Sequence, residues 1–244
     1  GGRQLGLGVI NHDCAHHAFF KNPKVDEFVG HWFAGAPMNT SLKAYRAYHL
    51  KHHKFAGTPD DPDIVFVKNY PVSRSSLKRK FMRDFTGQTG FRDTMRDLRK
   101  FKLSRNYPWV LFHVVLLAAV TLAGAPWAYL MWWAARLFVY PAIVRLRQIG
   151  EHGTALDRAS LDARLNTGTT VAPFWQRVIV APNDVNYHLE HHLLASVPPY
   201  RLGRLHRLLA ERGYYDGYAC ISKDYFDVIR RAVRPDEPRM VAAE

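Results

Sequence analysis

The chain has 244 residues, 48% of them hydrophobic, and carries a net charge of +13. This hydrophobic content excludes a largely disordered chain. A mean hydropathy of −0.24 is too low for a protein made only of membrane spans, so we expect some intramembrane helix and a large polar part. Two cysteines are too few for a disulfide framework, which favours a reducing compartment.

The N-terminal segment is predicted to be helical, and histidines appear in it almost at once. Residues 5–20 read as a helix that ends before a Lys-Asn-Pro sequence. Because the chain reaches its first histidines so early, we expect residues upstream to be missing. Residues 26–36 are apolar and aromatic but too short to cross a bilayer. Residues 42–54 are predicted to form a second helix, with Thr40 or Ser41 as its cap.

The middle of the chain combines strong positive charge with two apolar stretches. Residues 74–105 are basic, and this favours an anionic membrane face or an acidic protein partner. Residues 109–123 and 127–144 are each near the roughly 20 residues that a membrane helix needs. Lysines and arginines flank their outer ends and are absent from the turn between them. The pattern predicts a transmembrane hairpin over 107–145 with both ends in the cytoplasm, in which Arg136 must reach the interface or face the bundle interior.

Beyond the hairpin the chain becomes polar again. The second helix can continue past the membrane without a breaker, so Gln148 and His152 are expected one or two turns above the surface. A basic amphipathic helix is predicted near 199–212. We therefore expect an all-α fold with membrane helices, namely the hairpin plus a partial N-terminal span, and a cytoplasmic helical cap. The whole is expected to be a single domain, 1–244.

Three boxes hold most of the thirteen histidines: His12-x3-His16 with His17 adjacent, His49-x2-His52-His53, and His188-x2-His191-His192. The second and third boxes also share a tyrosine directly before their first histidine. Positions i, i+3 and i+4 of an α-helix lie on one face, so each box is expected to aim two or three imidazoles at one point.

The boxes supply more nitrogen donors than one metal ion can use. Eight or nine exceed the four ligands of a tetrahedral zinc and suit two metal ions with open positions. Imidazole binds iron, copper, zinc and nickel, so the ligand type alone does not name the metal. A metal-bound imidazole needs a partner for its other ring nitrogen. The acidic residues beside the boxes are the candidates: Asp13, Asp60, Asp61, Asp63, Glu151 and Glu190.

Boxes of the form HxxxH, HxxHH and HxxHH, in this order around a predicted hairpin, resemble those of the integral-membrane fatty acid desaturase and hydroxylase superfamily. The resemblance covers about residues 5–215. It implies an O2-dependent oxidoreductase with two Fe in a non-haem di-iron centre on the cytoplasmic side of the membrane. Its substrate would be an acyl chain or another lipophilic molecule of the lipid bilayer, and its electron donor a ferredoxin, a rubredoxin or a cytochrome b5-like protein.

Residue by residue, the resemblance implies nine metal ligands and no catalytic residue beyond them: His12, His16, His49, His52, His53, His152, His188, His191 and His192. His152 matches an extra histidine that the family places after its last membrane helix. Gln148 stands where some members carry an asparagine that reaches the metal through water. His17 competes with His16, because the first box permits two spacings. The family normally has two further membrane helices. Almost all of that part is absent here, so the chain alone could be inactive or unstable.

Desaturation of an acyl lipid is the favoured reaction, and two alternatives stay open. The same ligands serve a hydroxylase or ketolase acting on a carotenoid, sphingolipid, alkane or small molecule. A non-redox membrane metal-binding or transport protein is less favoured, because only His113, Thr121 and Arg136 are polar along the hairpin. His31, His113 and His206 are expected to be structural. No nucleic-acid recognition motif is present, and the arginine content favours a bacterial inner membrane.

Overall fold

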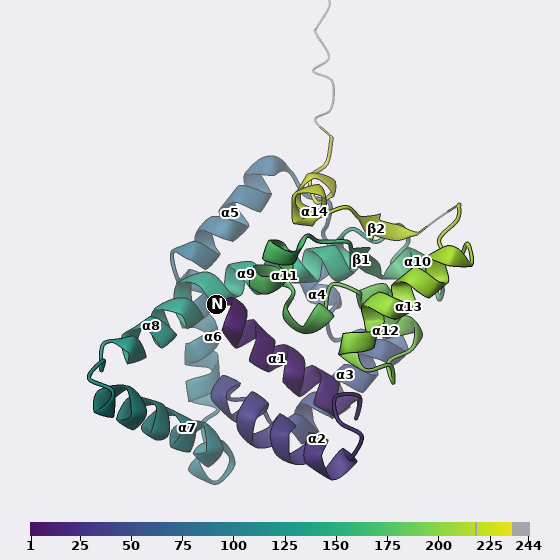
Figure 1. Ribbon diagram of the computed structural model, residues 1–244. Coiled ribbons are helices and arrows are strands. Elements are labelled where there is room, and N and C mark those ends of the chain that lie inside the picture. The colour runs from purple at the N-terminus through teal and green to yellow at the C-terminus, as the bar shows by residue number, and fades with distance from the viewer. Residues whose placement is uncertain (218, 236–244) are drawn as a thin grey trace, which may run out of the picture.

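The computed structural model describes residues 1–217 and 219–235, and the chain is mostly helical (Figure 1). The helices are α1 (Gly2–Ala15), α2 (Pro23–Val29), α3 (Leu42–Phe55), α4 (Ile64–Val67), α5 (Arg74–Phe85), α6 (Gln88–Arg99), α7 (Leu103–Leu122), α8 (Ala128–Ala134), α9 (Tyr140–Gln148), α10 (Ala163–Asn166), α11 (Phe174–Val180), α12 (His188–Leu193), α13 (Pro199–Glu211) and α14 (Tyr225–Arg231). Shorter 3-10 or π segments are η1 (Gly30–Gly35), η2 (Ala36–Met38), η3 (Ala135–Val139), η4 (Ile149–Gly153) and η5 (Pro182–Asp184).

The prediction of a mostly helical chain is confirmed, but the fold is not purely helical. The strands β1 (Gly168–Thr170) and β2 (Cys220–Ser222) pair in parallel, and the sequence analysis did not anticipate them. Parallel pairing needs a long connection, and α11 to α13 lie within it. Of the predicted domain 1–244, residues 218 and 236–244 lie outside the described residues.

Helix α1 lies in the middle of the molecule, where it contacts η1, α3 and α9 (Figure 1). Leu5 and Val9, one turn apart, are buried in the main hydrophobic cluster together with Ile143 of α9. His12, the next residue on this side, is buried as well. The helix therefore leads from the apolar core directly into a polar interior. It ends at Ala15, earlier than the predicted 5–20.

Helix α3 begins where it was predicted because a serine caps it. The Oγ atom of Ser41 accepts a hydrogen bond from the backbone N–H of Ala44 at 3.4 Å. Directly after this cap, Leu42 is buried in a small cluster with Cys14 and Ala15 of α1. Helices α1 and α3, which both carry histidines, are thus packed against each other beside the first box.

The small sheet holds the η4 segment, which carries His152, against the C-terminal part of the chain. Gly168 pairs with Cys220, and a Cβ atom at Gly168 would lie 2.4 Å from the carbonyl oxygen of Gly150. Only glycine allows this close approach of strand and helix backbone. The thiol of Cys220 donates to the carbonyl of Thr154 at 3.0 Å, just after η4.

A buried ion pair joins the basic helices α5 and α6 to α9. Asp84 is fully buried, and its two carboxylate oxygens accept hydrogen bonds from Arg145 at 2.5 and 2.9 Å. Thr89 at the start of α6 donates to the same carboxylate at 2.6 Å. A bidentate ion pair of this kind fixes the position of α5 relative to α9. Removing either partner would leave a buried charge uncompensated.

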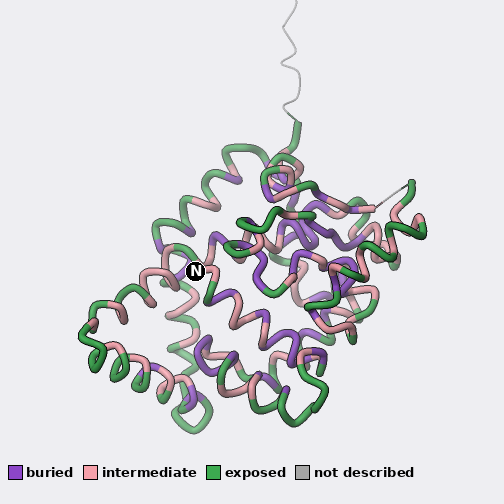
Figure 2. Tube along the Cα trace, in the orientation of Figure 1, coloured by how far each residue is buried: buried purple, intermediate pink, exposed green. Residues whose placement is uncertain are grey.

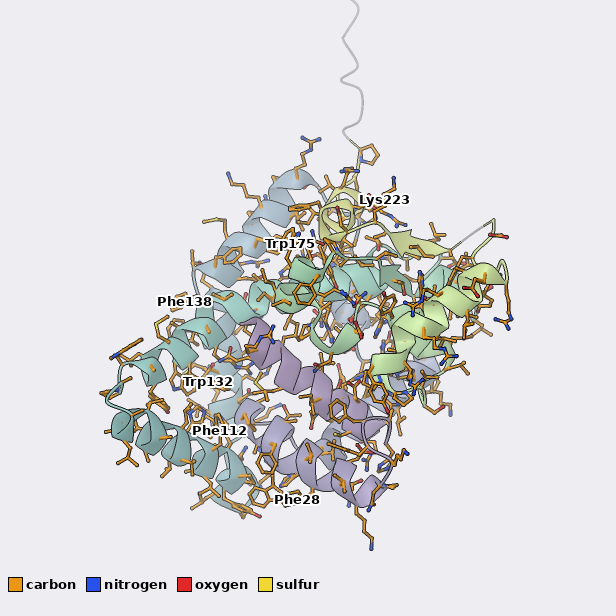
Figure 3. All side chains as sticks on the ribbon, in the orientation of Figure 1. Phe28, Phe112, Trp132, Phe138, Trp175 and Lys223 are labelled. Atoms are coloured by element: carbon orange, nitrogen blue, oxygen red, sulfur yellow. The ribbon has the colours of Figure 1, made fainter. Side chains whose placement is uncertain are left out.

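Helix α7 is the one helix among residues 1–217 and 219–235 that is long and apolar enough to cross a membrane, judged by length and composition. Only 17% of its most apolar window is buried, and α7 projects from the body together with α8 (Figures 1 and 2). Phe112 of α7 and Trp132 of α8 meet between the two helices with ring centroids 5.1 Å apart (Figure 3).

The second apolar stretch is not one continuous α-helix. It consists of α8, the π segment η3 and α9, and Pro141 lies in the first turn of α9. Proline has no backbone N–H, so the regular hydrogen-bond ladder is interrupted at this point. The predicted hairpin over 107–145 therefore has one α-helical arm of spanning length and a second arm that is helical throughout but contains a π segment, and its crossing of a membrane stays a prediction.

Candidate metal centre

The second histidine box divides between two metal-binding groups. The five-histidine group contains His49 and His53, which are one helical turn apart on α3. The four-histidine group contains His52 of the same box. The side chains of adjacent helix residues point about 100° apart, so the histidines of one short box can belong to two metal-binding groups.

The third box, on α12, divides in the opposite sense. His188 and His192, one turn apart, belong to the four-histidine group, and His191 belongs to the five-histidine group. The expectation that each box aims two or three imidazoles at one point thus holds for two histidines of each of these boxes, and the third histidine joins the other group. The rings of His53 and His192 stack at a centroid distance of 4.2 Å, which brings the two groups side by side.

The remaining members come from α1 and η4. His12 and His16 complete the five-histidine group, and His152 completes the four-histidine group. Within each group the potential ligand atoms all lie within 4.8 Å of one another. The structure thus brings together all nine histidines that were predicted to hold metal, five in one group and four in the other.

The spacing of the ring nitrogens fits a metal ion in each group. In the five-histidine group, the Nε2 atom of His53 lies 3.0 Å from that of His49 and 3.1 Å from that of His191. In the four-histidine group, the Nε2 atom of His188 lies 3.1 Å from that of His152 and 3.2 Å from that of His192. Two ligands at right angles on metal–nitrogen bonds of about 2.1 Å stand roughly 3 Å apart, so these contacts have the expected size.

Hydrogen bonding alone does not account for this packing. The Nε2 atoms of His12 and His16 are buried and have no hydrogen-bond partner among the described residues. Buried nitrogens without partners are costly, and a metal ion would use their lone pairs. The donor set therefore fits two metal ions bound by neutral imidazoles.

Several of the rings are oriented by a partner on their outer nitrogen. The Nδ1 atom of His12 lies 2.7 Å from Asp13 Oδ1, and that of His52 lies 2.8 Å from Asp61 Oδ1. Such partners fix the tautomer of a metal-bound imidazole and raise its basicity. Of the predicted acidic partners, Asp60 is exposed and orients no ring.

The four-histidine group has one further hydrogen bond of this kind and one longer contact with a carboxylate. The Nδ1 atom of His152 lies 3.2 Å from the carbonyl oxygen of Asn166. That of His188 lies 3.6 Å from Glu151, whose other oxygen is 3.3 Å from Arg147. Arg147 is half-buried beside the histidines, and sequence reasoning did not single it out.

Burial keeps most of these rings neutral. It lowers the pKa of His16 to about 4 and the pKa values of His53 and His152 to about 3, and neighbouring cationic groups add to the effect. Burial also raises the pKa of Glu151 to about 7, against the pull of Arg147. Neutral imidazole is the form that binds metal, so the rings are ready to do so at neutral pH.

A family model described as "Fatty acid desaturase" matches residues 1–223. The chain belongs to the fatty acid desaturase family. Di-iron histidine-box sites and association with membranes are typical of this family, and the two histidine groups with one spanning-length helix agree with it.

Named relatives carry out more than one reaction. An sn-1 oleoyl-lipid 12-desaturase from Synechocystis is 27% identical, over 84% of this chain and 65% of its own length. A dihydrorhizobitoxine desaturase from Bradyrhizobium elkanii is 26% identical, over 92% of this chain and 69% of its own. A beta-carotene ketolase from Paracoccus is 26% identical, over 81% and 72%. This desaturase-family chain thus spans about two thirds of the length of these relatives.

The structure also places the two further candidates that were named for this desaturase-family site. His17 lies outside both groups, in a left-handed conformation with φ of 53°, and its Nε2 is 3.7 Å from Glu27. Gln148 lines a small cavity of about 30 Å³ that is also lined by histidines of both groups: His12 and His49 of the five-histidine group, and His52, His152 and His188 of the four-histidine group. Gln148 is therefore close to histidines of both groups, whereas His17 belongs to neither.

Glu190, inside the third box, has a role that the sequence did not indicate. It is fully buried but orients none of the nine histidines; instead it accepts hydrogen bonds from Thr169 and Tyr215, both at 2.5 Å, and lies 2.6 Å from His206 Nδ1. These contacts anchor the short helix α12 to β1 and α13. The partners lie 16 to 25 residues away, so no local pattern could reveal them.

The three histidines that were expected to be structural lie outside both groups. His206 supports α12, as described above. His113 is buried between α7 and α8, stacks on Trp133, and its Nδ1 lies 3.0 Å from the hydroxyl of Tyr129. His31 packs edge-on against the neighbouring Trp32.

Proposed function

We propose that this chain forms the metal-binding part of a membrane-bound non-haem di-iron oxidase that introduces a double bond into an acyl chain with O2. The observation that carries the proposal is the pair of adjacent groups, with five and four histidines at ligand spacing, in a chain of the fatty acid desaturase family. The nine histidines would hold two irons: His12, His16, His49, His53 and His191 one of them, and His52, His152, His188 and His192 the other.

Two irons, when bound, would supply the reduction of O2 and the abstraction of hydrogen from an unactivated methylene. The protein would hold and orient the rings, mainly through Asp13 and Asp61. Burial of the ligand set keeps bulk water away from the reacting groups. Electrons would come from a ferredoxin, a rubredoxin or a cytochrome b5-like protein. The proposed substrate class agrees with the Synechocystis relative, which is named an oleoyl-lipid desaturase.

A hydroxylase or ketolase is the second candidate, and the Paracoccus relative named beta-carotene ketolase favours it. The transport alternative gains no comparable support. His113, one of three polar residues along the hairpin, is packed among aromatic rings, and its Nδ1 atom lies 3.0 Å from the hydroxyl of Tyr129.

The reaction is tested by metal and product analysis on the same sample. Protein in lipid nanodiscs should contain about two irons per chain, and with O2 and a reduced ferredoxin it should yield lipids lighter by two hydrogens. His191→Ala should abolish the product, whereas His31→Ala, outside both groups, should not. A product heavier by one oxygen would favour the hydroxylase. Zinc as the native metal, with no O2 consumption, would exclude both oxidases.

For the membrane arrangement, we propose that 107–145 crosses the membrane as a hairpin with the histidine groups on the cytoplasmic side, in a bacterial inner membrane. Cys14 and Cys220 are both buried, so an introduced cysteine can be labelled selectively. Ala123→Cys, exposed at the turn, should resist a thiol reagent added from the cytoplasmic side, and Ser75→Cys on α5 should react. Labelling of Ala123→Cys from the cytoplasm would contradict this topology.

A further inference from the structure

Helix α11 turns a polar side chain inward and its large apolar side chains outward. Gln176 is buried, and its Oε1 atom accepts a hydrogen bond from the backbone N–H of Tyr225 at 2.8 Å. Four apolar side chains of the helix are exposed by 38% to 74%: Phe174, Trp175, Val178 and Ile179. A helix that borders water normally shows the reverse arrangement, with its apolar stripe facing the core.

The exposed apolar surface extends from α11 to α14. Phe226 of α14 is 58% exposed, and its ring centroid lies 6.1 Å from that of Trp175. The two helices therefore present one surface, which we call the α11 patch: Phe174, Trp175, Val178, Ile179 and Phe226. Apolar residues that gather in this way, unlike single scattered ones, mark a contact with another molecule or with a membrane.

The α11 patch lies at the level where the predicted membrane hairpin ends. A Cβ atom at Gly2 would lie 2.6 Å from the carbonyl oxygen of Ile179. A Cβ atom at the preceding Gly1 would lie 2.8 Å from Val139 Cγ1 and 2.9 Å from Ile143 Cδ1. Val139 and Ile143 belong to the last two turns of the hairpin segment 107–145. Ile179 is therefore beside the end of the hairpin that is proposed to reach the cytoplasmic membrane surface.

The chemistry of the patch suits a bilayer surface. Tryptophan and other bulky apolar side chains are typical of helices that lie in the membrane–water interface. The cation on the helix, Arg177, is paired with Asp184 at 2.9 Å, so it does not enter the interface as a lone charge. At the edge of the helix, the exposed Arg3 donates a hydrogen bond to the carbonyl of Val178 at 2.7 Å. A long cationic side chain can stay at headgroup level beside inserted apolar residues.

We propose that α11 is an interfacial anchor, whose patch inserts into the headgroup region of the cytoplasmic leaflet while the helix lies along the membrane surface. A bilayer would take the exposed apolar side chains out of water. Because η5 links α11 to α12, the anchor would hold the third histidine box at a set height above the membrane. The inference goes beyond the proposed function, since it depends on neither the metal nor the reaction and uses only the proposed crossing of the hairpin.

Fluorescent labels on single introduced cysteines test the anchor in the full chain, placed in phosphatidylcholine nanodiscs. Cys14 and Cys220 are buried, so a bimane reagent modifies the introduced thiol selectively. Phospholipid brominated in its acyl chains quenches a label that touches the chains, and iodide quenches a label in water. We expect brominated lipid to quench the labels at Phe174→Cys and Ile179→Cys. Lipid brominated near the headgroup should be most effective, because an interfacial helix lies only about 5–10 Å into the boundary.

Two further labels calibrate the measurement. Val114→Cys, at a 60% exposed position in the middle of α7, should be quenched most by lipid brominated deep in its chains. Arg207→Cys is at an exposed position of α13, which lies on the other side of the body from α7 and α8 (Figure 1), and should be quenched by iodide alone. The Val114→Cys label reports on the hairpin and the α11 labels report on the anchor, so the two failures can be told apart.

Substitution of the two aromatic side chains tests whether the patch itself makes the contact. With the label at Ile179→Cys, the pair Phe174→Asp and Trp175→Asp should reduce quenching by brominated lipid about twofold or more, because insertion scales with the apolar area buried. The matched control, Phe174→Leu with Trp175→Leu, keeps apolar side chains and should retain the quenching. Both positions are exposed, so neither pair should alter the fold, and circular dichroism checks this.

Quenching of both α11 labels by iodide alone would overturn the proposal. Protection from both quenchers would overturn it as well, because another protein segment or a second copy of the chain would then cover the patch. Equal quenching in the aspartate and leucine variants would show that the aromatic side chains make no membrane contact, and it would also overturn the anchor.

Discussion

The five-histidine group and the four-histidine group lie side by side, yet the protein supports them differently. In the four-histidine group, the outer nitrogens of two rings are hydrogen-bonded, to Asp61 and to the backbone of Asn166, and that of a third ring lies 3.6 Å from Glu151. In the five-histidine group, among the described residues, only His12 has such a carboxylate, that of Asp13. Such partners fix the orientation of an imidazole and make it a stronger ligand. The five-histidine group therefore has more ligands, and the four-histidine group has more rings with an oriented outer nitrogen.

The difference implies two unequal metal positions. Five nitrogens leave one position of an octahedron open, and four leave two. Gln148 lines a small cavity with histidines of both groups, three of them from the four-histidine group and two from the five-histidine group. We therefore expect the metal of the four-histidine group to be the more accessible to a second ligand. The predictions below are arranged from the largest expected effect to the smallest.

Removal of one ring from either group should have the largest effect. His53→Ala and His192→Ala remove the two stacked rings, one from each group. Each variant should retain at most about one iron per chain and lose product formation by more than about 100-fold, since loss of an orienting partner alone costs 10–100-fold. Iron analysis and product analysis measure this. Two irons and normal turnover in either variant would contradict the ligand assignment.

Removal of an orienting carboxylate should have a smaller effect that is specific to one group. Asp61→Asn should weaken metal binding in the four-histidine group by about 10–100-fold and leave the other group unchanged, because Asp61 is hydrogen-bonded to His52. Asp13→Asn should do the reverse through His12. Chelator competition separates the two affinities, and Asp60→Asn, at an exposed neighbour, is the control. Equal loss from both sites in both variants would show that the groups are not independent.

Acid should destabilise the metal-free protein. Burial lowers the pKa of His16 to about 4 and that of His53 to about 3, so the unfolded chain takes up protons from pH 6.5 downward while the folded chain does not. The free energy of unfolding should therefore fall as pH falls from 6.5 to about 4. Burial also lowers the pKa of His52, but the hydrogen bond and charges of Asp61 and Asp63 outweigh it and raise the pKa overall. His52 therefore opposes this trend.

Denaturant unfolding at several pH values measures this trend on the metal-free protein. The midpoint should move to lower denaturant concentration between pH 6.5 and about 4. A constant midpoint across this window would mean that the buried rings are not neutral in the folded protein.

The smallest effect is expected at His17. Because His17 lies outside both groups and near Glu27, His17→Ala should leave iron content and product formation nearly unchanged. His16→Ala, at the neighbouring position, should lose iron as the other group members do. The pair of variants decides between the two spacings that the first box permits. Loss of iron in His17→Ala with retention in His16→Ala would reverse the assignment.

The nine histidines that come together were all predicted from the sequence, eight from the spacings within the three boxes and His152 from the resemblance to the desaturase family. The sequence also predicted the start of α3 from its serine cap and the basic helix α13 near 199–212. Asp61 and Asp63 were correctly named as neighbours of the second box, since they follow it in the next loop and lie 2.8 and 3.8 Å from His52.

Only the tertiary structure decided how the boxes are shared between two groups. That division depends on how α3 and α12 meet α1 and η4, and helical periodicity within one segment carries no such information. The anchoring of α12 through Glu190 is equally non-local, because the partners of Glu190 come from distant parts of the chain. A box fixes the face on which its rings stand, but the packing of helices fixes the metal that each ring can reach.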